Sequence, residues 1–590
     1  MLRPVFRSAG SIPVRSALAP AVLALIAPLQ SGAEKIERRS LLDAAPAHAV
    51  LTLTIEDWPR LRSQADSSAW AELLRAPAFD GLRSKVQVAL EQDEAQRLIS
   101  VLDATESVLL YAEGLEDIQQ VPWAFALRLR SDAERARQRI QPELDGMPES
   151  LTRDEREVHL SHDGVNWKGA VWWSEGVAAT WVPTREGAVD QVLALAQRLE
   201  RGAAEDSLAA RLGERRSTSA GAIELVLDLG ALARQNRSTL EESDRALWDA
   251  LGLAEMGWLT VRSALGDGVQ LEVLTSLDLP SSGLLSRWAT FTRPVPVELA
   301  ALAPADAVEV DVFGFDVASL WREVRQLVSK SHPDAANKLQ LGLEAASASL
   351  GVDLERDGIN ALTGEFAEIC LPIGPKWTDA APATVGALSS GALALSGMPG
   401  TSPGSALIVG LRETEGVERL LEALVELSGQ GEHLEDEEIA GQWMSSVDLP
   451  DVGMRPSWSF LQGKLVISLY AEPVRAVLEQ SAEGAAPGWL AAEAHRQALV
   501  ASDEHFYASA GDIPAFINSQ ILSPLQSIWA IPALAYVMQA ALGIHDESLV
   551  DDLTAARDAV PALVEKHLRG TMHSSMWIEG NSLRHRFWTR

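Results

Sequence analysis

Ala303-Pro304-Ala305-Asp306-Ala307-Val308 decides the fold, because Ala45-Pro46-Ala47-His48-Ala49-Val50 carries the same pattern 258 residues earlier. Each copy leads into alternating residues of strand type, at 308–313 and 50–55, and then into a helical pattern. Landmarks that recur in a fixed order are the sequence signature of an internal repeat. The sequence therefore predicts two related units in tandem.

Further landmarks recur in the same order along both halves. They are strands, hairpins with glycine at the turn, short helices and a closing hairpin. The matched stretches are 124–129 with 406–411, 172–177 with 459–464, 227–232 with 511–516, and the final turns at 266–268 and 579–581. Ordered matches of this kind strengthen the prediction of a duplication.

The helical patterns in the second half come as a pair. Apolar residues at helical spacing predict a helix over 317–328, which stops before Pro333. A second helix is expected over 339–350, with Gly351 at its end. Alternating strands with segregated helix pairs predict an α+β fold, in which each unit is an antiparallel sheet covered on one face by paired helices.

The expected boundaries follow from these patterns. Three arginines, an apolar run at 17–29 and Ser31-Gly32-Ala33 predict a signal peptide at 1–33, cleaved near Ala33. The run is too short to span a bilayer core, and retention as an anchor is the alternative. The first unit is expected at 41–279 and the second at 298–590. A linker rich in turn formers is expected at 280–297.

The composition is that of a folded globular protein, and the chain is strongly acidic. The formal net charge is −32, and removal of residues 1–33 would leave −35. Such a surface repels phosphate backbones, so nucleic-acid binding is not expected. Cys370 is the only cysteine, lies in a pattern typical of a buried strand, and is expected to be a core thiol.

No catalytic motif is present: a nucleophile elbow, a zincin helix, a dinucleotide fingerprint and a P-loop are all missing. His159 and His162 have a spacing that suits a metal, but a solvated turn is favoured. His573 and His585 flank the last hairpin, where surface strands are expected. The acidic run at 435–438 is expected to be a solvated loop. Most of the 18 tryptophans are expected in the core, and an exposed subset would suit sugar stacking. No cofactor and no metal is predicted.

Two uncharged stretches interrupt the second unit. Residues 380–411 are rich in Gly, Ala, Ser and Pro and are expected to form a mobile insertion. Residues 513–544 are apolar, whereas the matching part of the first unit is charged. Pro524 and Pro532 argue against a membrane helix there. A buried helical pair is favoured, and an apolar surface is the alternative. The candidate ligand or interface residues are Ile521, Leu525, Ile528, Trp529, Leu534 and Val537.

A resemblance accompanies these patterns. Pro46 to Val50 is followed by Leu73-Leu74-Arg75-Ala76-Pro77-Ala78-Phe79, and Gly351-Val352-Asp353-Leu354 and Gly463-Lys464-Leu465-Val466-Ile467 come later. In these features the chain resembles a group of bacterial exported proteins classed as a domain of unknown function. The resemblance covers most of residues 41–480. It implies an envelope or extracellular location, and it implies no activity and no site residue.

Two functional hypotheses follow. The first is a non-enzymatic exported protein, periplasmic or extracellular, that acts through a protein partner or self-association. The second is a carrier or chaperone for an apolar, lipid-like ligand held near residues 513–544. A hydrolase ranks third, because no nucleophile stands out in either unit. A continuous apolar cavity of several hundred Å³ would favour the carrier.

Overall fold

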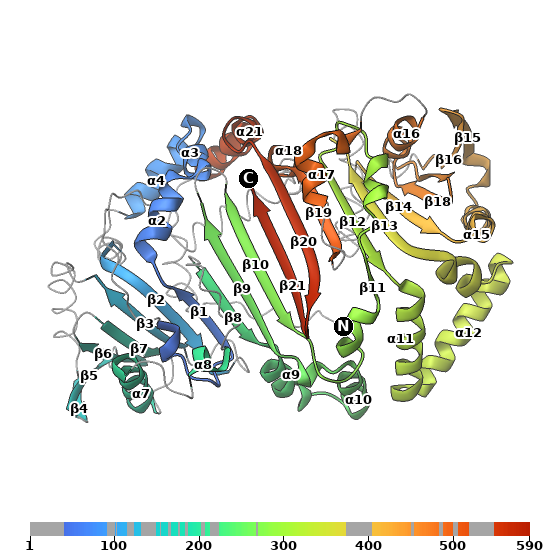
Figure 1. The fold of residues 1–590 in the computed structure, drawn as a ribbon. Helices are drawn as coiled ribbons and strands as arrows, with labels where there is room; N and C mark the ends of the chain where they lie inside the picture. The colour runs from blue at the N-terminus through green and yellow to red at the C-terminus, as the bar shows by residue number, and fades with distance from the viewer. Residues whose placement is uncertain are drawn as a thin grey trace. The chain divides into compact units, whose positions relative to one another are not determined.

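A computed structural model describes the chain over most of its length, and it is a mixture of helix and antiparallel sheet, which confirms the α+β class (Figure 1). Two compact units are distinguished. Unit 1 comprises residues 1–239, 257–277 and 528–563, and unit 2 comprises residues 240–256, 278–527 and 564–590. The described residues are 41–90, 101, 103–114, 123–130, 149–153, 155–162, 167–174, 177–182, 187–201, 207–212, 223–266, 270–372, 404–449, 454–482, 488–499, 505–517 and 548–590.

The described strands of unit 1 pair in one antiparallel series. Across the sheet the order is β4, β5, β6, β7, β3, β2, β1, β8, β9 and β10. The strands are β1 (Leu51–Ile55), β2 (Thr105–Ala112), β3 (Trp123–Leu129), β4 (Glu149–Arg153), β5 (Arg156–His162), β6 (Trp167–Ser174), β7 (Val177–Val182), β8 (Ile223–Asp228), β9 (Trp258–Leu265) and β10 (Leu271–Asp278).

Helices lie against both faces of the unit 1 sheet. One face carries Leu109 and Ala126 and packs on α7 (Ala188–Arg201), while Val108 and Leu127 on the other face pack on Trp58 of α2. The other helices are α2 (Trp58–Ser67), α3 (Ala69–Leu74), α4 (Asp80–Leu90), α8 (Leu208–Leu212), α9 (Leu229–Arg237) and α21 (Leu549–His567), whose residues up to 563 belong to this unit.

The described strands of unit 2 follow the order β15, β16, β17, β18, β14, β13, β12, β19, β20 and β21, again antiparallel. They are β12 (Glu309–Phe315), β13 (Leu362–Cys370), β14 (Ser405–Leu411), β15 (Leu434–Ile439), β16 (Gln442–Val447), β17 (Ser457–Leu461), β18 (Lys464–Ser468), β19 (His505–Asp512), β20 (Thr571–Glu579) and β21 (Ser582–Thr589). The short β11 (Thr292–Arg293) pairs with the end of β12.

Both faces of the unit 2 sheet are covered, so the expectation of helices on one face only is wrong. Val310 and Val312 lie in a core with Val474 and Val477 of α16 (Ala471–Gln480). The opposite face contributes Phe366 and other apolar residues to a core with α11 (Val317–Ser331) and α15 (Thr414–Leu427). Side chains along a strand alternate between the two faces of the sheet. Both faces of the unit 2 sheet carry apolar side chains, so both need a helical cover. The remaining helices are α10 (Glu242–Leu251), α12 (Pro333–Leu350), α17 (Glu493–Leu499) and α18 (Ile513–Phe516).

Several local predictions are confirmed. The helix expected over 317–328 is α11, which begins after Asp316, whose carboxylate accepts the Ser319 N–H at 3.0 Å. The second helix is α12, and Gly351 ends it with a φ of 68°, in the left-handed region that favours glycine. Cys370 is buried on β13, as expected. None of the described helices combines the length and the apolarity needed to cross a bilayer.

The acidic run at 435–438 is a strand, so its prediction as a loop is wrong. It forms most of β15, the edge strand of the unit 2 sheet. The backbone pairs with β16, while Ile439 and Met444 anchor the hairpin in the core. Charged residues on an edge strand also disfavour pairing with another sheet.

Candidate functional site

The six apolar residues predicted as a ligand or interface site lie outside the described residues. These are Ile521, Leu525, Ile528, Trp529, Leu534 and Val537. Of the uncharged stretch, the structure describes α18 and Ile517. The expected mobile insertion at 380–411 also lies largely outside, up to the start of β14. These predictions therefore stay predictions.

A cluster of carboxyl groups lies on one face of the unit 2 sheet. Glu309 and Asp311 alternate with buried valines along β12, so both side chains point to the same face. The strand register places Glu368 of β13 directly opposite Asp311 on one side, and Ser509 of β19 opposite it on the other. Like charges directly opposite each other destabilise a sheet, so the three carboxyls of this cluster cannot all be ionised cheaply.

Burial favours the neutral form of these groups, and it outweighs donated hydrogen bonds that favour the ionised form. Tyr507 Oη donates to Asp311 Oδ1 at 2.8 Å, and Ser509 Oγ donates to Glu309 Oε1 at 3.4 Å. Burial, followed by the charges of Asp311 and Glu368, raises the pKa of Glu309 to about 9. Burial also raises the pKa of Asp311. The cluster therefore holds protons at neutral pH.

Cys370 lies beside the same cluster, opposite Glu309. Burial, and then the nearby carboxyls, raise the pKa of its thiol well above the usual value. A thiol is a nucleophile in its thiolate form, and this environment disfavours the thiolate. Cys370 is thus a core residue of β13.

A serine and a histidine meet on the same face, nearer the end of the sheet. Ser574 Oγ lies 2.8 Å from His585 Nε2, and burial lowers the pKa of His585. The pair resembles part of a hydrolase site, but β20 lies between β19 and β21, and the two ladders use its backbone N–H groups. No backbone N–H groups of β20 are therefore left to form an oxyanion hole beside Ser574.

The other histidine predictions have mixed outcomes. His573 lies on β20 and is 5% exposed, so the expected surface position is wrong for this residue. Burial, followed by Arg590 and His495, lowers the pKa of His573 to about 4. His159 and His162 lie on β5, so the expected solvated turn is wrong for these two residues. The side chain of His162 and the whole of Asp163 lie outside the described residues. Among the side chains that the structure describes, no group of three His, Cys, Asp or Glu residues suits a metal ion.

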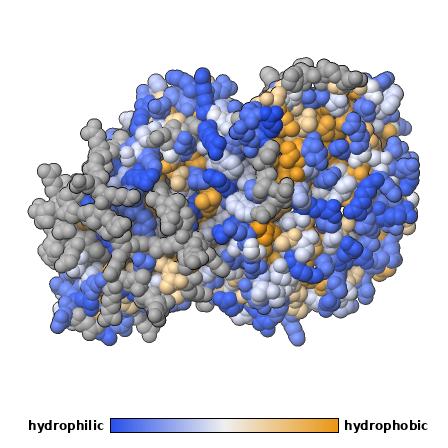
Figure 2. All heavy atoms as spheres, viewed as in Figure 1, coloured by the Kyte–Doolittle hydropathy of each residue, from blue (hydrophilic) through white to orange (hydrophobic). Residues whose placement is uncertain are grey.

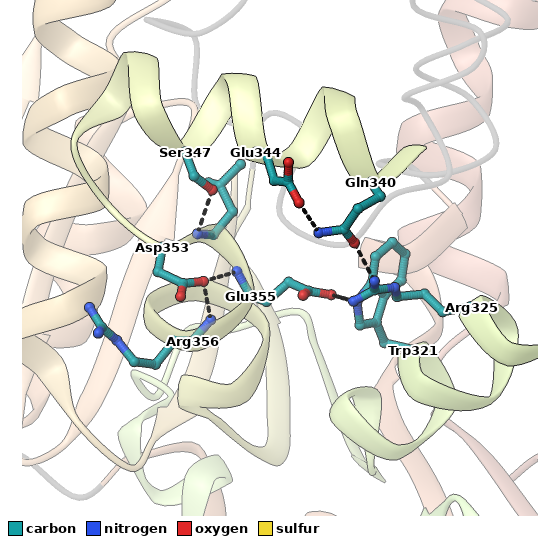
Figure 3. A network of polar contacts seen from close by, with 9 residues as sticks. Trp321, Arg325, Gln340, Glu344, Ser347, Asp353, Glu355 and Arg356 are labelled. Carbon is teal, nitrogen blue, oxygen red and sulfur yellow. Dashed lines mark hydrogen bonds and ion pairs between the residues drawn. The ribbon is translucent and has the colours of Figure 1, made fainter. Parts of the chain in front are cut away.

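A polar network holds the helix pair α11–α12 in place (Figure 3). Trp321 Nε1 donates to Glu355 Oε1 at 2.7 Å, and Arg325 bridges Glu355 and Gln340. Next along the chain, Asp353 accepts the backbone N–H groups of residues 355 and 356. Each charge in this network has a protein partner, so the network positions helices and offers no free group to a ligand.

A pocket of about 350 Å³ opens in unit 2 between α10, residues 283–287 and α11. Its charged groups are Arg287, Glu323 and Lys330, and Arg287 pairs with Glu323 at 2.7 Å. Charged groups along the wall make it unsuitable for a lipid-like ligand.

Two large apolar side chains are exposed on the hairpin of β15 and β16 in unit 2. Trp443 is 64% exposed and Leu434 is 37% exposed. We call these two residues the edge surface. Figure 2 shows that hydrophobic residues on the viewed face lie in groups between hydrophilic ones.

The fold explains why the edge surface is exposed. Val417, Leu421 and Val425 of α15 pack on the sheet, and α15 ends at Leu427. The chain then enters β15 at Leu434, which is opposite the buried Val447. Trp443 is on the same sheet face as Leu434, because it pairs with Glu438, four residues further along β15. The apolar sheet face thus continues past its helical cover to the edge strands.

Comparisons with known proteins identify no family. No family model matches the chain, and no curated protein matches it. Crystal form III of TP0453 is similar to 44% of the chain and 90% of its own length, at 12% identity and a TM-score of 0.25. Crystal form IV matches 41% of the chain and 81% of its own, at 10% identity and a TM-score of 0.24. Scores this low carry no argument, and the resemblance to bacterial exported proteins remains a prediction.

Proposed function

We propose that this protein is an exported, non-enzymatic protein of the envelope or extracellular space, and that it acts through protein interaction. The observation that carries the proposal is the edge surface, where Trp443 is 64% exposed and Leu434 is 37% exposed beside a well-packed core. Exposed apolar groups with an aromatic residue are typical of protein-binding sites. Export rests on the N-terminal segment.

The proposal includes an origin by duplication. The strand order of unit 1 corresponds one to one with that of unit 2, from β4 and β15 at one edge to β10 and β21. The two central strands, β1 and β12, are those that follow the repeated Pro-Ala motif. The caps correspond too: Asp228 accepts the Ala231 N–H at 2.7 Å and Asp512 accepts the Ala515 N–H at 3.0 Å.

The edge surface distinguishes the two related units. In unit 1 the corresponding edge strand is β4, where Leu151 is exposed between polar neighbours. Unit 2 instead exposes Trp443 and Leu434 on the same face of its edge hairpin. Related units that differ at one surface are expected to differ in binding, so we assign interaction to unit 2.

The polar groups support a binding protein over an enzyme. The carboxyl cluster is held neutral, the Cys370 thiol is disfavoured as a thiolate, and Ser574 has no backbone oxyanion donors beside it. A nucleophile needs a base, an orienting group and stabilisation of developing charge. The described part of unit 2 does not assemble this combination.

Photo-crosslinking within the cells of origin tests the proposal. Benzoylphenylalanine replaces Leu434 in the full chain, and in a matched control it replaces Leu151 on β4. We expect a discrete protein adduct from position 434, its loss when Trp443→Ala is added, and no such adduct from position 151. Identical adducts from both positions, or none from position 434, would contradict the proposal.

A further inference from the structure

The pocket of unit 2 is a candidate binding site built from residues other than the edge surface. Its lining residues on α11 are Glu323, Gln326, Leu327 and Lys330. Their spacing of three and four positions places them on one face of that helix. Residues 283–287 and the end of α10, which lies beside α11, form the other walls (Figure 1). The volume of about 350 Å³ is at the lower end of the range for pockets that hold small molecules.

Backbone contacts fix the walls of this pocket. The Leu284 N–H donates to the Ala250 carbonyl at 3.0 Å, which holds residues 283–287 against the end of α10. Gly283 has a φ of 83°, and a Cβ atom there would lie 2.5 Å from the backbone nitrogen of Gly252. Only glycine permits both this conformation and this close approach. The pocket is therefore set by the packing of the backbone and is formed before a ligand arrives.

The charged groups of the wall are not balanced. Arg287 and Lys330 are basic and Glu323 is acidic, a formal charge of +1 in a chain whose net charge is −32. Arg287 Nη2 donates to Glu323 Oε2 at 2.7 Å, so the one carboxylate already has a cationic partner. Lys330 has no ion-pair or hydrogen-bond partner among the described residues. A guanidinium has five N–H donors, of which the contact with Glu323 uses one.

We propose that this pocket binds a small organic anion. Its carboxylate or phosphate group pairs with Lys330 Nζ and with the remaining N–H donors of Arg287, and its apolar part contacts Leu284 and Leu327. The inference goes beyond the proposed function, because it concerns a different class of ligand and different residues of unit 2.

Charge decides the class of ligand. A cationic ligand would face two basic groups, while the only carboxylate of the wall is paired with Arg287. A neutral ligand would leave Lys330 without a partner. An anion pairs with both basic groups at once, and hydrogen bonds between ionised partners are stronger than those between neutral ones.

Fluorescence titration with anilinonaphthalene sulfonate tests the inference on the full mature chain. This dye carries one sulfonate on an apolar ring system, and its fluorescence rises when the rings leave water. Benzoate and benzylamine serve as competitors, because they share a ring and differ in the sign of their charge. We expect benzoate to displace the dye, and benzylamine at the same concentration to leave it bound.

Variants that each change one charge locate the site. Lys330→Gln removes the unpaired cation, so the affinity for the dye should fall about two- to fivefold. Glu323→Gln releases Arg287 for the ligand, so the affinity should rise by a similar factor, about two- to fivefold. Lys338→Gln is the matched control, because Lys338 is an exposed lysine on α12 outside the pocket, and this variant should bind as the wild type does. Thermal unfolding verifies that each variant is folded.

Three results would overturn the inference. They are absence of dye binding, equal affinity of the wild type, Lys330→Gln and Glu323→Gln, and equal displacement by benzoate and benzylamine. The photo-crosslink from position 434 concerns other residues and does not involve the dye. Failure of the pocket would therefore leave the proposed function standing, and failure of the crosslink would leave the pocket standing.

Discussion

Glu309 offers a sharp test of the carboxyl cluster, through the variant Glu309→Gln. The pKa of Glu309 is raised to about 9 in the folded protein, whereas an unfolded glutamate has an ordinary pKa of 4.5. A raised folded pKa means that the contribution to stability is present below pH 4.5 and is lost as pH rises toward 9. At pH 7 the difference spans two and a half units, which costs about 3 kcal/mol.

Glutamine has the shape of a protonated glutamate and cannot ionise. Glu309→Gln is therefore expected to increase the free energy of unfolding of unit 2 by about 3 kcal/mol at pH 7 and to change it little at pH 4.5. Chains with more than one unit need not unfold in one step. Hydrogen exchange of β12 and β13 peptides, read by mass spectrometry, reports the region directly.

The expected exchange of these peptides is slower by roughly a hundredfold at pH 7, with no comparable change at pH 4.5. Glu241→Gln serves as the control, because Glu241 is exposed and makes no capping hydrogen bond at α10. An unchanged exchange rate at pH 7, or an equal effect at both pH values, would refute the account of the carboxyl cluster.

Three further predictions test the fold of each unit. His573 has a pKa of about 4 in the folded state, so the free energy of unfolding falls by up to about 3 kcal/mol as pH falls from 6.5 to about 4. Between pH 7 and 4.5, the urea midpoint of His573→Gln should therefore fall less than that of the wild type. Equal falls in the two proteins would contradict this prediction. Asp228→Ala should lower stability by about 1–2 kcal/mol through loss of the α9 N-cap. The loss should exceed that of Asp512→Ala at α18, because Asp228 is 6% exposed and Asp512 is exposed. Hydrogen exchange of α9 and α18 compares the two variants, and equal losses would contradict the prediction. Met444 is fully buried, so Met444→Ala should cost about 2–5 kcal/mol in chemical unfolding; a cost below about 1 kcal/mol would show that the hairpin is not anchored there.

Sequence patterns predicted the helices and strands that have one apolar face and one polar face. The helix α11 was predictable because its apolar stripe recurs at helical spacing and Pro333 follows, and β12 because valines alternate with other residues. The same logic failed at β15, where four acids in a row show no alternation. Its strand conformation follows from pairing with β16, which in turn pairs with β17, and from the burial of Ile439 and Met444 in the core.

The sites depend on contacts between distant residues. Asp311 and Glu368 are 57 positions apart in sequence and become neighbours through strand register, which composition does not specify. The one local signal was the alternation of Glu309 and Asp311 with valines. Trp443 gave no signal, because a strand exposes or buries its aromatic residues according to where the covering helix ends, and α15 ends at Leu427.

Native mass spectrometry of the mature chain, isolated from its own envelope without detergent, tests the central claim most directly. We predict that the wild type carries a protein partner in a stoichiometric complex, and that the Trp443→Ala chain is isolated as a bare monomer. A small apolar mass on both chains would contradict interaction at the edge surface and favour a lipid carrier. A bare wild-type monomer would contradict it as well.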